Sequence, residues 1–212
     1  PFLNQGNLLM VPAWEGRQLW IKVNTSGLAP GVWLTQLRLR SLDPELIEAT
    51  SELRITVWPH RLPDKHPLRL CQWGYVHTSV LRDQPQAALE DQVAHGTNGF
   101  VGLFYPKAQF DETGELVGEI DFAEHDMYVN QHAPYGIILF CGYQGALQGP
   151  APKGTEAYRK AHVAWLRAWV KHLAELGLDY DDYALYPVDE PGLREGLVEE
   201  FLDYAQLARD AD

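Results

Sequence analysis

The sequence predicts an α/β chain with a partial β-sandwich over residues 1–67, followed over residues 68–212 by the first four βα units of a (β/α)8 TIM-type barrel. Two observations favour this division. In the first part apolar and polar residues alternate, which is the period of strands with one buried face. In the second part short apolar runs alternate with segments of helical period, the pattern of a parallel sheet with helical connections.

Alternation in the first part is clearest in three segments separated by turn residues. They are residues 18–24, 32–40 and 53–58. Pro30 and Gly31 set a tight turn between the first two segments. Short strands with such punctuation favour a small β-sandwich or a part of one. Residues 61–67 follow, with two prolines, several charges and no periodicity, and are predicted to be a linker.

Four apolar runs in the second part are predicted to be strands. They are residues 68–75, 99–105 and 135–141, and the run from Tyr183 to the acids Asp189 and Glu190. The third run is apolar throughout, which is typical of a parallel strand covered on both faces. Such units fit either half of an eight-stranded barrel or a small doubly wound domain.

No G-x-G-x-x-G opens a helix, which disfavours a dinucleotide site and favours the half barrel. A half barrel would leave an exposed strand edge, so we expect the natural protein to continue past Asp212.

Helices are predicted from capping residues and periodicity. The expected helices are residues 83–95, 121–132, 157–176 and 197–208. Asp83 is the expected N-cap of the first, and Asp121 with Glu124 has the capping-box spacing at the start of the second. The third has the clearest apolar face, at three- and four-residue spacing, and ends at Gly177.

Composition narrows the possible functions. The chain has 212 residues, 46% of them hydrophobic, which is enough for a sizeable core. Its 17 basic and 29 acidic residues give a net charge of −12. Such a surface repels phosphate backbones and anionic lipids, so we expect no nucleic-acid partner and no membrane partner. The sequence contains no apolar run of about 18 residues that would span a membrane.

The candidate catalytic residues are Asp189 and Glu190. They stand at the carboxyl end of a predicted strand, where α/β barrels place their catalytic groups. Glycosidic bond cleavage needs one group to protonate the leaving oxygen and a second to handle charge at the anomeric carbon. Neighbouring strand residues point to opposite faces, so both acids share a pocket only if the strand ends, or twists, between them, which Pro191 and Gly192 favour. In the alternative interpretation, Glu190 only caps the following helix.

Aromatic and hydrogen-bonding residues follow the other predicted strands and precede the acids. Flat rings pack against the CH groups of sugars, whereas the alternative role of each ring is packing at the sheet edge. His77 is alternatively a surface histidine. The candidate substrate-binding residues are Trp73, Tyr75, His77, Tyr105, Tyr143 and Tyr186.

Other chemistry receives little support from the sequence. The histidines show no metal-binding spacing; His125 and His132 share a helix face but have no third ligand, so they are predicted to be solvated. Cys71 and Cys141 lie in apolar runs and are predicted to be buried free thiols. We therefore expect no metal and no cofactor. No G-x-S-x-G motif is present.

Segments throughout the chain resemble a known family. Residues 17–23, 29–33 and 53–58 are similar to the β-sandwich that leads into the catalytic barrel of glycoside hydrolase family 123 and its uncharacterised bacterial relatives. Residues 186–191, Tyr-Pro-Val-Asp-Glu-Pro, resemble the Asp-Glu pair at the end of that family's fourth barrel strand. The resemblance implies an exported enzyme that hydrolyses terminal β-linked N-acetylgalactosamine, although the chain contains no signal peptide.

The resemblance also implies a mechanism. The acetamido oxygen of the sugar attacks the anomeric carbon, Asp189 orients the acetamido group, and Glu190 is the general acid and base. One alternative is a retaining glycosidase whose nucleophile lies outside this chain; such enzymes carry Asn before the acid, where this chain has Asp189. Another is a non-catalytic carbohydrate-binding or scaffold module. We expect this chain alone to be inactive, because a half barrel lacks half of the barrel mouth, and a displacement of about 1 Å can already cost about 100-fold in rate.

Overall fold

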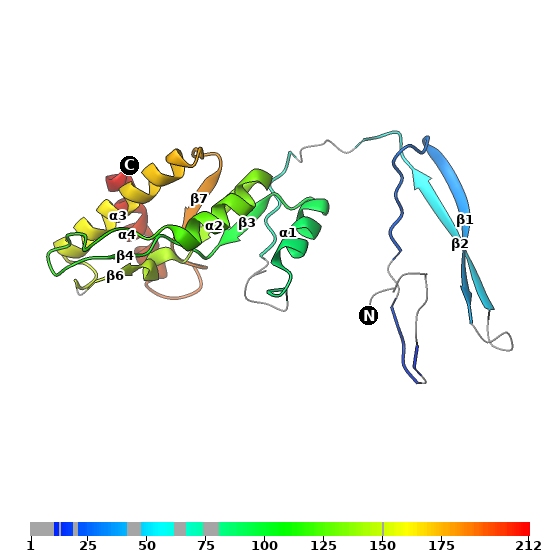
Figure 1. The fold of residues 1–212 in the computed structure, drawn as a ribbon, viewed down its shortest axis with the longest axis horizontal. Coiled ribbons are helices and arrows are strands. Elements are labelled where there is room, and N and C mark those ends of the chain that lie inside the picture. Colours follow the sequence, from blue (N-terminus) through cyan, green and yellow to red (C-terminus); the bar gives the residue numbers. More distant parts are fainter. Residues whose placement is uncertain are drawn as a thin grey trace. The chain divides into compact units, whose positions relative to one another are not determined.

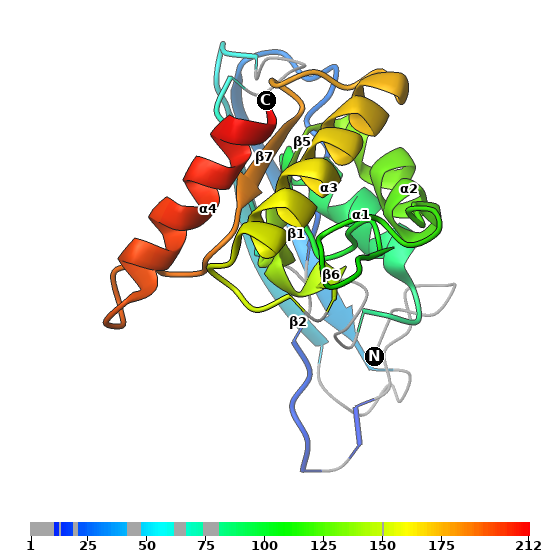
Figure 2. The ribbon, with the colours of Figure 1, turned by 90° about the vertical axis from the view of Figure 1, so that its left-hand side faces the viewer.

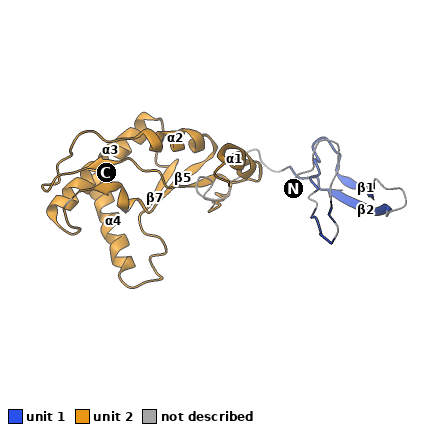
Figure 3. Cartoon of the chain, turned by 60° about the horizontal axis from the view of Figure 1, so that its bottom comes forward, with its two compact units in different colours: residues 1–62 blue, residues 63–212 orange. Residues whose placement is uncertain are grey.

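A computed structural model of the chain describes residues 11–12, 14–18, 21–41, 48–61, 67–73, 81–149 and 151–212. The chain divides into two compact units, residues 1–62 and residues 63–212 (Figure 3).

The first unit contains an antiparallel ribbon of two long strands, β1 (Gly31–Arg40) and β2 (Glu48–Val57) (Figure 1). Trp33 lies opposite Ile55 in the ladder. Since opposite residues share a face, most apolar residues of both strands lie on the side of Trp33 and Ile55, whereas Val32 and Leu34 lie on the other side. The alternation predicted for these two segments is therefore confirmed as strand structure.

The predicted β-sandwich is wrong. A sandwich needs a second sheet packed on the first, and in the described part of the first unit the ribbon is the sheet that forms. Residues 21–24, predicted as the end of a strand, belong to no strand. Trp33 remains 42% exposed on the apolar face. Alternation marks a face suited to burial, but it does not say what covers that face.

The second unit is built around a parallel sheet in the order β3 (Gly99–Gly102), β5 (Ile137–Cys141), β7 (Tyr183–Tyr186). A second, smaller parallel pair joins β4 (Ala108–Gln109) to β6 (Leu147–Gln148). Four α-helices are described: α1 (Pro85–Ala94), α2 (Ala123–His132), α3 (Glu156–Glu175) and α4 (Leu197–Ala211). The described residues of the unit also include two short 3₁₀ helices, η1 (Ala133–Tyr135) and η2 (Tyr143–Ala146).

The predicted half barrel is also wrong. The described residues form a small mixed α/β fold with three small sheets, two of them parallel, and not four successive βα units of a barrel. Of the predicted strand 68–75, residues 68–73 are described, and there Cys71 contributes an isolated bridge to Gly99. Alternating strands and helices predict that neighbouring strands pair in parallel; they do not fix how many strands pair or whether the sheet closes.

One face of the β3–β5–β7 sheet carries the core. Ile138 and Phe140 are fully buried, and they pack with residues of α2, α3 and α4, which Figure 2 shows on one side of the sheet. Ile137 and Leu139, which point the other way, are only half-buried. The sequence predicted burial of both faces for this strand, whereas the structure shows full burial of one.

The predicted position of the long helix is confirmed, whereas a predicted helix cap is wrong. The long amphipathic helix is confirmed as α3, where the Thr155 hydroxyl accepts the Tyr158 N–H at 3.2 Å. By contrast, α1 starts after Gln84 without a side-chain cap, so the prediction of Asp83 as N-cap is wrong. Pro85 at the first helical turn fixes the backbone there without that hydrogen bond.

Candidate functional site at the carboxyl end of strand β7

The two predicted catalytic acids lie in the loop that follows β7. The strand ends at Tyr186, and both Asp189 and Glu190 are exposed beyond it. The opposite-facing alternation of strand residues therefore does not separate their side chains. Helix α4 begins only at Leu197, after the N-cap Gly196. Glu190 is thus too far from the helix to be its cap, which excludes the alternative structural role considered for it.

Glu190 has an unusual backbone conformation. Its φ is +47°, in the left-handed region that residues with a Cβ rarely adopt. Its N–H donates to the hydroxyl oxygen of Tyr186 at 2.9 Å, and its carbonyl accepts the N–H of Leu193 at 3.0 Å. Local strain of this kind persists only where surrounding contacts enforce it, and it is concentrated at functional sites.

The ends of β5 and of the segment after β3 meet this loop. Cys141 pairs with Tyr186 in the parallel ladder, and the Tyr105 hydroxyl donates to the Cys141 carbonyl. Burial, with a smaller contribution from the nearby Asp189 carboxylate, raises the pKa of the Cys141 thiol to about 11. The thiol is therefore protonated at neutral pH and is a poor nucleophile. Cys141 is buried as predicted, whereas Cys71 is exposed, contrary to the prediction.

The predicted substrate-binding residues separate into four groups. Trp73 is 44% exposed and packs edge-on against Tyr186, with ring centroids 6.2 Å apart, next to the acid loop. Tyr105 is half-buried, with its hydroxyl engaged as described. Tyr143 is 1% exposed and packs among Trp165, Trp169 and Tyr204, so it has no surface to offer a ligand. Tyr75 and His77 lie outside the described residues.

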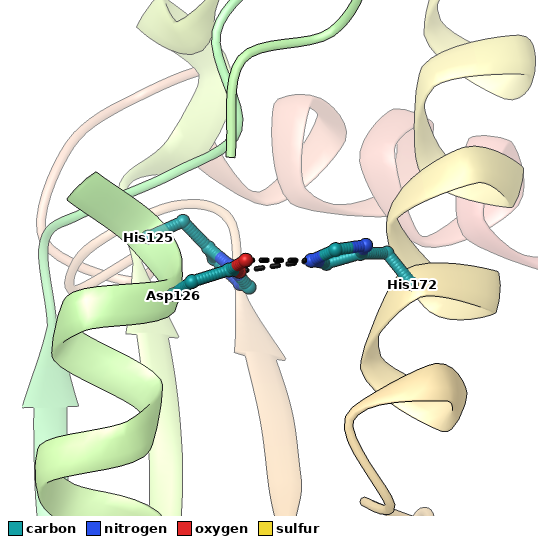
Figure 4. Close-up of side chains that lie close together, drawn as sticks. All are labelled: His125, Asp126 and His172. Carbon is teal, nitrogen blue, oxygen red and sulfur yellow. Dashed lines mark hydrogen bonds and ion pairs between the residues drawn. The ribbon is translucent and has the colours of Figure 1, made fainter. Parts of the chain in front are cut away.

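A second cluster of ionisable groups lies between α2 and α3. His125 and Asp126 come from α2 and His172 from α3, and Figure 4 shows the Asp126 carboxylate facing the His172 ring. One potential ligand atom from each residue lies within 4.8 Å of the others. We call these three residues the His125 cluster. The spacing alone would suit a divalent metal with histidine and carboxylate ligands.

Hydrogen bonding argues against a metal in the His125 cluster. The indole N–H of Trp169 donates to Nε2 of His125 at 2.8 Å. Indole nitrogen is only a donor, so Nε2 holds a lone pair and the ring proton is on Nδ1. That Nδ1–H points at the Asp126 carboxylate, 2.9 Å away. A metal-bound imidazole instead donates from its second nitrogen, which the Trp169 N–H prevents.

The His125 cluster instead joins the two helices. Nε2 of His172 lies 2.9 and 3.0 Å from the two Asp126 oxygens, so the carboxylate accepts from imidazoles of both α2 and α3. Burial lowers the pKa of His125, so its ring is neutral near pH 7. His125 and His132 are fully buried, which overturns the prediction that they are solvated. Trp169 lies 44 residues from His125, so spacing along the sequence gave no sign of this contact.

A third buried histidine lies under the contact between α3 and α4. His162 is fully buried, and neither ring nitrogen has a hydrogen-bond partner among the described residues. Its ring packs beside Tyr158 and Tyr204. Burial, with a smaller effect from the cationic Lys153, lowers the pKa of His162 to about 4. It is a neutral core residue at physiological pH.

A cavity of about 490 Å³ opens beside this contact between α3 and α4. Its two lining cations are already paired: Lys153 binds Glu200 at 2.8 Å, and Arg159 binds Asp210. Lys153 also lies over the Tyr204 ring. Because both cations already bind carboxylates, the cavity offers an anionic ligand no cation that is free of an ion pair.

Comparison of the sequence with protein-family models and with curated proteins finds no match. Functional assignment therefore rests on the residues and their geometry. No helix in the described ranges has the length and apolar character needed to cross a bilayer. Among the described groups, the loop after β7 has exposed carboxylates and a strained backbone, with the exposed ring of Trp73 beside it, and it is the best candidate for the functional site.

Proposed function

We propose that this protein hydrolyses β-linked N-acetylhexosamine, of the N-acetylgalactosamine type, with Glu190 as general acid and base and Asp189 as the residue that orients the acetamido group. The observation that carries the proposal is the position of two adjacent, exposed carboxylates beyond the carboxyl end of β7. Parallel α/β sheets bind ligands at that edge.

The chemistry assigns a different task to each acid. Glu190 gives a proton to the leaving glycosidic oxygen while the acetamido carbonyl oxygen of the substrate attacks the anomeric carbon. Asp189 accepts a hydrogen bond from the acetamido N–H and stabilises the positive charge that develops on that group. Water then opens the cyclic intermediate, and Glu190 takes back the proton from that water.

The surroundings of the loop suit a sugar. Trp73 presents an exposed aromatic ring beside Tyr186, and the CH face of a hexosamine packs well on such a ring. The acids provide hydrogen-bond acceptors for hydroxyl groups at the same place.

The exposure of both carboxylates favours one alternative, a carbohydrate-binding module without catalysis. A general acid must hold its proton at the working pH, and water around a carboxyl group favours the charged form. In the catalytic proposal, the bound sugar displaces that water. The two functions predict the same contacts and differ in whether the glycosidic bond breaks.

The test is hydrolysis of an aryl β-N-acetylgalactosaminide by the natural protein and by two isosteric variants. We expect Glu190→Gln and Asp189→Asn to lower kcat by about 10²–10⁴-fold, the usual contribution of a positioned acid or base. Glu195→Gln removes an exposed carboxylate from the same loop and is the matched control, expected to keep full activity.

Full activity in both site variants would contradict the assignment. Equal activity on an aryl β-galactoside, which lacks the acetamido group, would contradict the substrate-assisted mechanism. Binding of N-acetylgalactosamine that Asp189→Asn weakens, without any hydrolysis by the wild type, would identify a binding module.

A further inference from the structure

Tyr186 forms a hydrogen bond with the candidate acid Glu190, and its place at the end of β7 fixes the position of its hydroxyl group. It is the last residue of β7, paired with Cys141, and its carbonyl accepts the Gly142 N–H at 2.9 Å. The sheet thus fixes its backbone, and the Trp73 ring packs edge-on against its ring. With its backbone and ring both held, the hydroxyl oxygen occupies a defined position beyond the strand end.

That hydroxyl oxygen accepts the backbone N–H of Glu190 at 2.9 Å. Glu190 is also the residue with the left-handed φ of +47°. A glutamate relaxes to negative φ when nothing opposes it, because its Cβ crowds the backbone in the left-handed region. The bond from Tyr186 acts on the amide whose rotation sets this φ, so it opposes that relaxation.

We propose that Tyr186 is a positioning residue: its hydroxyl holds Glu190 in the left-handed conformation and so fixes the direction from which the Glu190 carboxyl delivers its proton. The inference deepens the proposed function and rests on it. It gives Tyr186 a role additional to the sugar contact predicted from the sequence. Proton transfer depends on placement within hydrogen-bond reach of the leaving oxygen, so a relaxed turn would impair this step more than substrate binding.

The test compares Tyr186→Phe with Tyr180→Phe. The first removes the hydroxyl and keeps the ring against Trp73. The second removes the hydroxyl of an exposed tyrosine that bonds Asp212, away from the acid loop. Both substitutions are conservative, and equal circular dichroism spectra would show that both variants fold.

The first readout is hydrogen exchange of the Glu190 amide, which reports on the bond independently of any activity. We expect exchange in Tyr186→Phe to be at least about tenfold faster than in the wild type, and unchanged in Tyr180→Phe. Unchanged exchange in Tyr186→Phe would overturn the proposal, whatever the activity of the protein.

The second readout is the dependence of kcat on the leaving group of aryl β-N-acetylgalactosaminides. A misplaced acid slows substrates with weakly acidic phenols, which need the proton, more than substrates with strongly acidic ones. For substrates with weakly acidic phenols, we expect Tyr186→Phe to lower kcat by about tenfold or more. For substrates with strongly acidic phenols kcat should change little, and KM should be nearly unchanged for both. An equal loss on both substrates would indicate a merely structural role and overturn the proposal.

Failure of the proposed function would be seen separately. If the wild type hydrolyses none of these glycosides, the catalytic assignment of Glu190 falls, and with it the role of Tyr186 in proton delivery. Amide exchange would still measure whether the Tyr186 hydroxyl holds the turn.

Discussion

Two groups of ionisable side chains in the second unit differ in how many of their polar atoms are available to bind a ligand. The loop after β7 exposes Asp189 and Glu190 on a strained backbone. The His125 cluster lies between α2 and α3, and its facing nitrogens and oxygens bond one another or Trp169. Distances alone would make the second group the better metal site, yet its lone pairs are already used. A ligand site needs polar atoms that are not already hydrogen-bonded within the protein, in addition to side chains that lie close together.

The largest predicted effect concerns Trp169, which anchors the His125 cluster. Trp169→Ala removes a ring that is 1% exposed and leaves His125 Nε2 without its donor. We expect the free energy of unfolding to fall by about 3–5 kcal/mol, whereas Glu190→Ala should change it by less than about 1 kcal/mol. Urea denaturation followed by circular dichroism measures both. Similar values for the two variants would remove the distinction between a structural and an exposed group.

The next effect is a pH dependence that comes from the buried histidines. The folded-state pKa is lowered in both His125 and His162, to about 4 in His162. Unfolded chains bind these protons near pH 6.5, so the free energy of unfolding falls as pH drops from about 6.5, and the part due to His162 levels off below about 4. His162 alone contributes about 3 kcal/mol to this loss.

The measurement for His162 is the difference in unfolding free energy between the wild type and His162→Phe across this pH range. The control is His95→Asn, which replaces an exposed histidine instead of a buried one. A wild-type curve parallel to that of His162→Phe would show that His162 is not buried as a neutral ring.

A smaller effect tests the strain in the acid loop. Glycine adopts positive φ freely, so Glu190→Gly relieves the strain that a Cβ causes at φ +47°. Glu195 is not among the residues with positive φ, and glycine there only adds entropy to the unfolded chain. We expect Glu190→Gly to be about 1 kcal/mol more stable than Glu195→Gly. Thermal melts compare them, and equal stability would contradict the left-handed turn.

The smallest expected effect is that of zinc on the His125 cluster. A metal that binds only the folded state raises the melting temperature, by an amount that grows with its concentration relative to Kd. Because Trp169 keeps His125 in the wrong tautomer for ligation, we expect no change in the wild type at about 100 μM Zn²⁺. A rise of several degrees that disappears in His172→Gln would show that the cluster binds metal.

Local features of the fold were predictable, and distant contacts were not. The periodicity of α3 and the apolar run of β5 depend on neighbouring residues, and both elements formed where expected. The sandwich and the half barrel depend on which strands meet, which the βα pattern and alternation leave open. The helix caps depend on side-chain bonds to the first helical turn, and Asp83 shows that a suitable residue type does not ensure such a bond.

The same division holds for the candidate site. The position of Asp189 and Glu190 after a strand follows from the apolar run before them and the Pro-Gly pair after them. The hydrogen bond from the Glu190 N–H to Tyr186 depends on a left-handed turn at Glu190. The sequence could not predict this turn, because glutamate rarely adopts positive φ. Tyr143 was predicted at the sugar surface, but the chain turns into η2 there and the ring enters the core.

The most direct test of the central claim, that ligand chemistry belongs to the loop after β7, is titration of ¹⁵N-labelled protein with N-acetylgalactosamine. The account predicts shifts in the backbone amides of Asp189 and Glu190 and in the indole N–H of Trp73, with no shift of the Trp169 indole N–H. Shifts centred on Trp169, or an unchanged loop at saturating sugar, would contradict it.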